Sequence, residues 1–344
     1  MANATPMLRP GRALLRETIT IAVTILGLLA VTFLIARVMP VDPVLAVVGD
    51  NARPDVYEKA RQDLGLDKPL PVQFWLYLKK VAVGDFGRSV LTSNLVLDDI
   101  KRVFPATLEL ATLGTLIGVC LGIPLGVLAA TRQGRWQDQV ARFIGLFGYS
   151  IPIFWLGLMG LLLFYAKLGW VGGPGRIDVA YQDFVTPITG VLLVDCMLQG
   201  EWDAFRNAVS HLILPSAVLG LFSTAYISRM TRSFMINELQ QHYVTTARVK
   251  GLSEARVVWG HALRNALVPL LTVIALSYAN LLEGSVLTET VFAWPGLGRY
   301  ITNSLLNADM NAVLGGTIVV GLIFVGINLL ADFLGRAFDP RARS

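Results

Sequence analysis

The sequence predicts an all-α integral membrane protein with six transmembrane helices. Hydrophobic residues make up 54% of its 344 residues and charged residues only 15%, whereas average soluble domains carry about 25% charged residues. The hydrophobic residues gather in six uncharged runs. These runs are close to the length of about 17 to 25 residues that a helix needs to cross a bilayer.

The whole chain, residues 1–344, is predicted to form one membrane domain. With their flanking residues, the six spans are expected at 17–38, 106–130, 142–167, 211–232, 265–287 and 312–335. The first run follows Arg9, Arg12 and Arg16, as in a signal peptide, but it is long and lacks a small-x-small cleavage pattern. We therefore expect it to remain as the first span.

The distribution of Lys and Arg predicts the orientation of these spans. With both termini in the cytoplasm, the cytoplasmic parts hold fifteen Lys and Arg against six Asp and Glu, and the remainder holds fourteen against eighteen. This asymmetry follows the positive-inside rule. The basic character of the chain is therefore explained by membrane topology, and no nucleic-acid partner is expected.

Three segments are expected on the outer side: residues 39–105, 168–210 and 288–311. Within the first, residues 53–64 and 72–83 are typical of short amphipathic helices at the membrane surface. The apolar run at 188–194 in the second is too short to span a bilayer. In the third, the Trp294-Pro295-Gly296 turn is expected to interrupt any helix.

Motifs for chemistry are missing from the sequence. It contains no G-x-x-x-x-G-K-[ST] phosphate loop, no H-E-x-x-H, no C-x-x-C and no G-x-S-x-G. His211 is expected at a membrane boundary, and His242 and His261 on the solvated face of the segment between the fourth and fifth spans. Cys120 and Cys196 lie in very different surroundings. The sequence therefore predicts no catalytic site, cofactor, metal site or disulfide.

Residues 233–264, called the basic loop below, form the polar segment between the fourth and fifth spans. Leu239 to Lys250 is expected to be helical, with Arg248 and Lys250 in its last turn, where cations complement the helix dipole. Gly251 suits a left-handed C-cap. Ser253 is then placed to cap a second helix, with Glu254 in its first turn. The pattern predicts two short helices joined at a glycine.

Ionisable residues near membrane depth are candidates for the pathway or its gate, because burying a charge in a bilayer is costly. Glu109 follows Pro105 at the expected start of the second span, and Glu283 lies at the outer end of the fifth. A structural alternative holds for both, namely a carboxylate at a helix end in contact with water.

The basic loop resembles the conserved loop of binding-protein-dependent ABC importer permeases, with Thr245, Thr246, Ala247 and Gly251 on its E-A-A-x-x-x-G pattern. Thr245 and Thr246 depart from Glu-Ala, but YVTTARVKGL is similar to the version in the dipeptide, oligopeptide and nickel branch. FPATLELA at 104–111, SRMTRSFM at 228–235 and LTETVFAWPGLGRY at 287–300 agree with that branch. Residues 187–215 resemble the external insertion of its dipeptide-permease B-type subunits.

The resemblance implies a type I ABC importer permease fold in a bacterial inner membrane. It implies a heterodimer with a homologous C-type permease subunit, two cytoplasmic ABC ATPase subunits, a periplasmic substrate-binding protein and surrounding lipid. Coupling to the ATPase is expected through a set of residues in the basic loop: Thr245, Thr246, Ala247, Arg248, Lys250, Gly251, Leu252, Ser253 and Arg256. Ala247 and Gly251 would supply small residues at the contact, and the cations would set its register.

Several alternatives stay open on the sequence alone. The cargo is expected to be a dipeptide or short peptide, but other members of the resembling family carry nickel, opines or glycosides. An ion-coupled secondary transporter is disfavoured because the sequence shows no internal repeat and no charged coupling groups at mid-span. A channel lacks a filter-like loop, and a membrane-anchored DNA-binding protein would need a longer basic segment than the loop provides.

Overall fold

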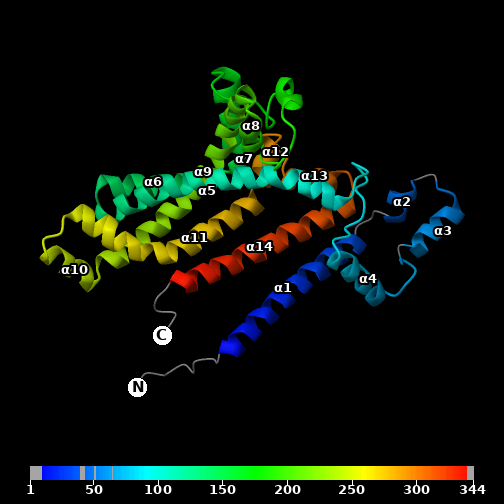
Figure 1. Ribbon diagram of the computed structural model, residues 1–344, viewed down its shortest axis with the longest axis horizontal. Coiled ribbons are helices and arrows are strands. Elements are labelled where there is room, and N and C mark those ends of the chain that lie inside the picture. Colours follow the sequence, from blue (N-terminus) through cyan, green and yellow to red (C-terminus); the bar gives the residue numbers. More distant parts are fainter. Residues whose placement is uncertain (1–9, 39–42, 50–51, 64, 339–344) are drawn as a thin grey trace. The chain divides into compact units, whose positions relative to one another are not determined.

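The computed structural model describes residues 10–38, 43–49, 52–63 and 65–338. Within these ranges every regular element is a helix, apart from an isolated bridge between Arg88 and Leu95 (Figure 1). The all-α prediction is confirmed. The chain divides into two compact units, residues 1–99 with 303–325 and residues 100–302 with 326–344. Arg9 and residues 339–344 lie outside the described residues.

The first unit is built around α1, Pro10–Val38, and α4, Leu70–Ala82. Phe33 on α1 packs against Phe74 on α4, with ring centroids 5.2 Å apart, and Thr32 shares a 3.0 Å hydrogen bond with the Tyr77 hydroxyl. The short helices α2, Pro43–Val48, and α3, Pro54–Asp63, lie between them in sequence. Helices α3 and α4 confirm the two helices expected at 53–64 and 72–83.

Asp309 joins distant segments of the first unit. Its carboxylate accepts hydrogen bonds from the Ser89 hydroxyl at 2.5 Å and the Leu91 N–H at 3.2 Å. The same side chain accepts the Ala312 N–H at 3.3 Å, at the first turn of α14, Met310–Phe338. Capping of this kind satisfies a backbone donor that a helix start leaves free.

The second unit contains most of the long helices. Its elements are α5 Val96–Thr131, α6 Trp136–Ser150, α7 Ile153–Gly160, the π-helical turn η1 Leu161–Lys167, the 3₁₀ turn η2 Val179–Phe184, α8 Leu192–Gln199, α9 Trp202–Leu239, α10 His242–Val249, the π-helical turn η3 Arg256–Ala262, α11 Leu263–Gly284, α12 Val286–Val291, α13 Leu297–Leu306 and α14. Three of these helices, α5, α13 and α14, extend into the first unit.

Glycines recur every fourth residue along one face of α5, at positions 114, 118, 122 and 126. Each of them lies directly against α9. A Cβ atom on Gly118 would be 2.1 Å from the Ser223 hydroxyl oxygen, and one on Gly126 would be 2.5 Å from the Thr231 Cβ. Small residues at this spacing let two membrane helices approach until their backbones touch. We call this face of α5 the glycine ridge.

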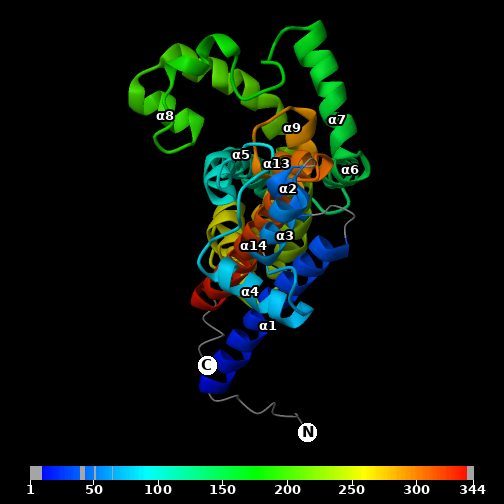
Figure 2. The ribbon, with the colours of Figure 1, turned by 90° about the vertical axis from the view of Figure 1, so that its right-hand side faces the viewer.

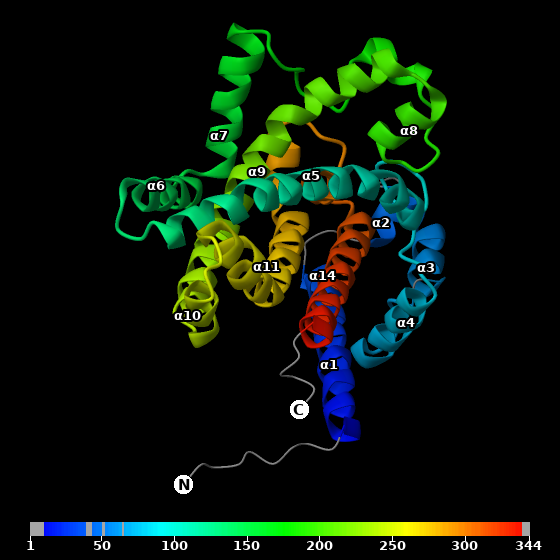
Figure 3. The same cartoon turned by 60° about the vertical axis from the view of Figure 1, so that its left-hand side comes forward.

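The segment predicted as the third span is bent. A span was expected at 142–167, and within it α6 and α7 meet at Ile151–Pro152 with a bend of 97°. Figures 2 and 3 show α7 turning steeply away from α6. Pro152 lacks an N–H, and its ring disfavours helical backbone at the residue before it. Ile151 accordingly takes extended backbone, with φ −89° and ψ 126°. The structure therefore places a break at Pro152 within the span predicted at 142–167.

The lengths and composition of the described helices bear on the expected six spans. Four helical stretches are long and apolar enough to cross a membrane, namely 96–131, 202–239, 256–284 and 310–331, and the bent pair α6–α7 makes a fifth if it counts as one span. In α1 the apolar part, Ile19–Ile35, is shorter than these. The first of the six spans therefore stays a prediction.

Substituting Gly118 with alanine should destabilise the protein, because the added Cβ cannot fit against Ser223. Overpacking of this kind costs about 1–3 kcal/mol, so the thermal unfolding temperature in detergent should fall. Gly145→Ala on α6 is the matched control, because a Cβ there meets nothing within 4 Å. Equal unfolding temperatures for the two variants would contradict the close contact between α5 and α9.

Candidate functional site

The turn between α10 and the following helix is a Schellman motif centred on Gly251. The Leu252 N–H donates to the Ala247 carbonyl at 3.3 Å, and the Gly251 N–H donates to the Arg248 carbonyl at 2.9 Å. Gly251 has φ +80°, which residues with a side chain rarely adopt. The expected left-handed cap is confirmed. The helix before it is shorter than expected, because a turn at 240–241 separates α9 from α10.

The second helix of the basic loop begins at Glu254, directly after Ser253. The Val257 N–H donates to the Ser253 carbonyl at 3.0 Å. The Arg248 guanidinium donates a hydrogen bond of 2.8 Å to the Glu254 carboxylate, so an ion pair connects the two sides of the Gly251 turn. Both side chains are exposed, and exposed pairs contribute about 1 kcal/mol or less. The pair orients the turn more than it stabilises the fold.

The basic loop has a hydrophobic core that continues into three long helices. Val244 on α10 and Val257 on η3 are fully buried. They belong to one cluster with Val127 on α5, Met235 on α9 and Leu270 on α11. Because packed interiors transmit displacement rather than absorb it, a force on the loop reaches α5, α9 and α11 directly.

The structure separates the expected coupling residues into an inner and an outer set. Ala247 is only 8% exposed and packs within the hydrophobic cluster, where Leu252 is half-buried. The outer set consists of Thr245, Thr246, Arg248, Lys250, Gly251, Ser253 and Arg256. Ala247 therefore packs in the hydrophobic cluster beneath the exposed face of the loop and is not part of that face.

Sequence reasoning missed Val249, the most exposed large apolar residue of the basic loop. Val249 is 82% exposed at the C-terminal end of α10, beside Lys250. Trp259 on η3 is also half exposed and lines a cavity of about 410 Å³ between the loop and the end of α5. An apolar residue flanked by cations is typical of a protein contact surface. Only its exposure distinguishes Val249 from the core valines.

Glu109 lies in the interior of α5, thirteen residues after Val96, and not at a helix start as the sequence suggested. Its side chain is 3% exposed. The Arg176 guanidinium donates to Oε2 at 2.7 and 2.9 Å, and the Leu193 N–H donates to Oε1 at 3.2 Å. Glu109 therefore anchors the 168–210 segment to α5. The first turn of α5 carries Asp98 and Asp99 instead.

Asp195 holds the loop that precedes α8. Its carboxylate accepts the N–H and the hydroxyl of Thr189, both at 2.7 Å, and the Gly190 N–H at 3.0 Å. Burial by itself would raise the pKa of Asp195, but these hydrogen bonds together lower the pKa below its ordinary value. The carboxylate is thereby kept charged, and the loop keeps its conformation.

Glu283 is exposed at the end of α11, whereas the buried carboxylate of this region is Glu289 on α12. Glu289 accepts hydrogen bonds from the Thr107 hydroxyl at 2.6 Å and the Arg299 N–H at 2.8 Å. Burial raises its pKa. A Cβ on Gly296 would be 2.4 Å from this carboxylate, which explains the glycine after Trp294-Pro295. That turn lies between α12 and α13, so the chain is not helical there, as expected.

Asp138 connects α6 to α9 and was not singled out from the sequence. It is fully buried and accepts hydrogen bonds from the Arg232 guanidinium at 2.7 and 3.0 Å. Arg142 donates at 2.7 Å and the Gly134 N–H at 2.9 Å. A buried carboxylate with two guanidinium partners gives geometric specificity to a contact. The i, i+4 spacing of Asp138 and Arg142 was the available signal.

Glu109→Gln should destabilise the protein by about 3–5 kcal/mol, because it leaves the Arg176 charge buried without a counterion. The double variant Glu109→Gln/Arg176→Gln should lose less than the sum of the two single variants, since the pair acts as a unit. Chemical denaturation in detergent provides the measurement. Additive losses would show that the two side chains do not form this ion pair.

The sequence matches two families of known proteins over most of its length. Residues 122–344 match the family described as "Binding-protein-dependent transport system inner membrane component", and residues 10–111 match the N-terminal family of such membrane components. The two matches together cover nearly all of the residues that the structure describes.

Two relatives and one solved structure illustrate the similarity. The di/tripeptide transport system permease protein DppB of Pseudomonas aeruginosa is 42% identical over 321 residues, 93% of this chain and 95% of the relative. The dipeptide transport system permease protein DppB of Escherichia coli is 40% identical over 332 residues, 96% of this chain and 98% of the relative. A structure of the inward-facing MetNI methionine ABC transporter is 19% identical, with a TM-score of 0.48 over 67% of this chain and 92% of that chain.

Proposed function

Because this chain belongs to the family of binding-protein-dependent transport system inner membrane components, we propose that it is the permease subunit of an ATP-driven importer of dipeptides or other short peptides. The single observation that supports this cargo is the 42% identity, over 93% of the chain, to a di/tripeptide permease protein. Nickel, opines and glycosides are the alternative cargoes.

The proposed importer contains further subunits. This chain would pair with a homologous C-type permease, receive its cargo from a periplasmic binding protein and contact two cytoplasmic ATPase subunits. Both termini and the basic loop would lie in the cytoplasm, as the distribution of Lys and Arg favours. The sequence has no phosphate loop, so nucleotide binding and hydrolysis are assigned to the ATPase subunits.

The outer face of the basic loop is the proposed contact with the ATPase. Val249 offers an apolar anchor, and Lys250 and Arg256 are exposed beside the Gly251 turn. Charges at the edge of such a contact set register and association rate more than affinity. The turn itself is rigid, because both Schellman hydrogen bonds and the Arg248–Glu254 pair hold it.

Transport would follow from the continuity of the loop with the spans. Closure of the ATPase dimer on ATP would displace the basic loop, and the cluster of Met235, Val257 and Leu270 would carry that displacement into α9 and α11. ATP would then favour one of two conformations of the spans, because the ATPase binds the loop better in that conformation. Hydrolysis would restore the other conformation.

Uptake by the purified importer tests the proposed function. The complete complex, reconstituted in right-side-out vesicles loaded with ATP and supplied with its binding protein, should accumulate a labelled dipeptide. Accumulation should require internal ATP and should persist when an uncoupler dissipates the proton gradient. Uptake driven by the gradient without the ATPase would contradict the ABC assignment, and uptake of Ni²⁺ but not of peptide would contradict the cargo.

Gly251→Pro should abolish stimulation of the ATPase by this subunit while leaving membrane insertion intact. Proline cannot adopt the φ of +80° found there and removes the N–H that donates to Arg248. Gly251→Asn is the matched control, because asparagine tolerates left-handed backbone and keeps the donor. We expect stimulation to fall at least about tenfold in the first variant and to be largely kept in the second. Normal transport by Gly251→Pro would contradict the coupling role.

A further inference from the structure

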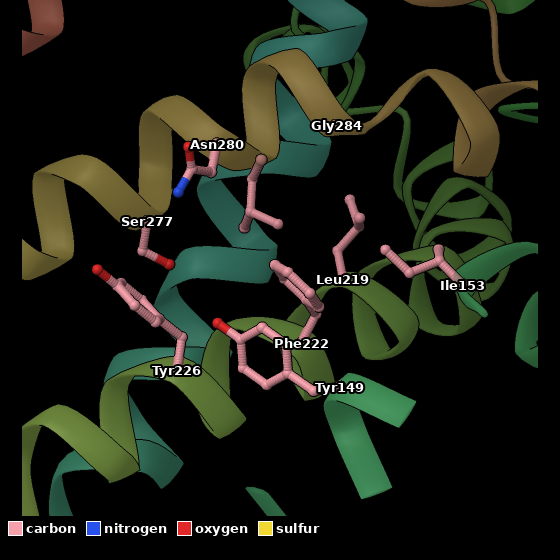
Figure 4. A pocket seen from close by; sticks show the side chains of 9 residues that line it. Tyr149, Ile153, Leu219, Phe222, Tyr226, Ser277, Asn280 and Gly284 are labelled. Atoms are coloured by element: carbon pink, nitrogen blue, oxygen red, sulfur yellow. The ribbon is translucent and has the colours of Figure 1, made fainter. Parts of the chain in front are cut away.

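A cavity of about 160 Å³ lies where α6 bends into α7 and faces α9 and α11. Tyr149 comes from the end of α6, and Ile153 is the first residue of α7. The remaining lining residues recur at helical spacing on one face each of two helices: Leu219, Phe222 and Tyr226 on α9, and Ser277, Asn280, Leu281 and Gly284 on α11 (Figure 4). The bend at Ile151–Pro152 brings Tyr149 to this place.

The walls of the cavity combine aromatic rings with polar groups. Tyr149 and Phe222 contact each other with ring centroids 5.0 Å apart. Figure 4 shows Asn280 and Ser277 on α11 across from the aromatic side chains. The Ser277 hydroxyl shares a hydrogen bond of 3.0 Å with Ser223. Pockets that bind small molecules have this composition, apolar walls with a few polar groups that fix orientation.

Three polar groups that line the cavity are available to bind a ligand. Among the described residues, the hydroxyls of Tyr149 and Tyr226 and the amide of Asn280 make no hydrogen bond to another protein group. Asn280 is exposed on a helix that is long and apolar enough to span a membrane. An amide that faced lipid there would be costly, so such groups face a polar cavity or a partner. This side of α11 is therefore not a lipid-facing surface.

Arg229 carries a positive charge next to Tyr149, one of the residues that line the cavity. It follows Tyr226 by one helical turn on α9, and its guanidinium carbon lies 5.0 Å from the centroid of the Tyr149 ring. The neighbouring Arg232 is bound by Asp138 at 2.7 Å. Arg229 by contrast is exposed and makes no ion pair within the described part of the chain. An unpaired guanidinium next to aromatic rings is suited to a carboxylate that carries an apolar side chain.

We propose that this cavity holds the C-terminal residue of a short peptide in transit, an inference that rests on the proposed function of peptide import. Arg229 binds the α-carboxylate, the rings of Tyr149, Phe222 and Tyr226 enclose the side chain, and Asn280 bonds the peptide amide. The volume is below the range of about 300–1,000 Å³ that accommodates drug-sized ligands. It therefore takes one residue of the peptide, and the homologous permease subunit would contact the rest.

The first test fills the cavity without disturbing its walls. A Cβ on Gly284 meets nothing within 4 Å, so Gly284→Leu places its side chain in the open space. Gly145→Leu is the matched control on α6, where the added Cβ is equally free and lies outside the cavity. In the reconstituted complete importer, Gly284→Leu should lower peptide uptake per ATP hydrolysed about tenfold or more. Gly145→Leu should not change this ratio.

The second test removes the charge. Arg229→Gln should lower the same ratio about tenfold, the size of a lost charge-assisted hydrogen bond, and Arg229→Lys should restore part of it. Arg206→Gln is the control on the same helix, because Arg206 is 81% exposed and remote from the cavity. If wild-type protein imports no peptide, the proposed function fails. If it imports peptide and both Gly284→Leu and Arg229→Gln do so equally well, only the cavity assignment is overturned.

Discussion

The close packing of α5 against α9 is the constraint on which the second unit depends. Apolar helices gain nothing hydrophobic by leaving lipid for one another, so their association needs contact along the backbone and hydrogen bonds between helices. The glycine ridge of α5 allows backbone contact with α9. The hydrogen bond between Ser223 and Ser277 joins α9 to α11. Three helices that are long enough to span a membrane are thereby held together.

This three-helix core extends between the basic loop and the 168–210 segment. Ala130 of α5 belongs to the hydrophobic cluster of the basic loop, whereas Glu109 anchors the 168–210 segment. The two residues are 21 positions apart on one helix, or about 30 Å, which is about the thickness of the hydrocarbon core of a bilayer. The proposed contact with an ATPase at one end and the proposed contact with the cargo-delivering protein at the other would therefore be joined by continuous helices.

The cavity at the α6–α7 bend lies on the same helices that carry the basic loop. Its walls come from α9 and α11, and both helices contribute to the cluster beneath the loop. A displacement of the loop would therefore reach the walls of the cavity without any separate relay. Asp138 contributes to this arrangement, because its bonds to Arg232 keep α6 in register with α9 close to Arg229. Arg232 is thus held by an ion pair within the fold, whereas Arg229 is the residue that we propose for the cargo carboxylate.

The sequence by itself determined the helical class, most of the long helices and the Gly251 turn, because hydrophobic run length and glycine backbone freedom are local properties. The four-residue spacing of the glycines from Gly114 to Gly126 is likewise visible in the sequence. Only the tertiary structure decided that Ala247 is buried and that Glu109 binds the 168–210 segment to α5. It also decided that Glu289 is buried and hydrogen-bonded to Thr107, 182 positions away in the sequence. Such roles depend on partners from distant parts of the chain, and an apolar or acidic residue in isolation does not reveal which surface will cover it.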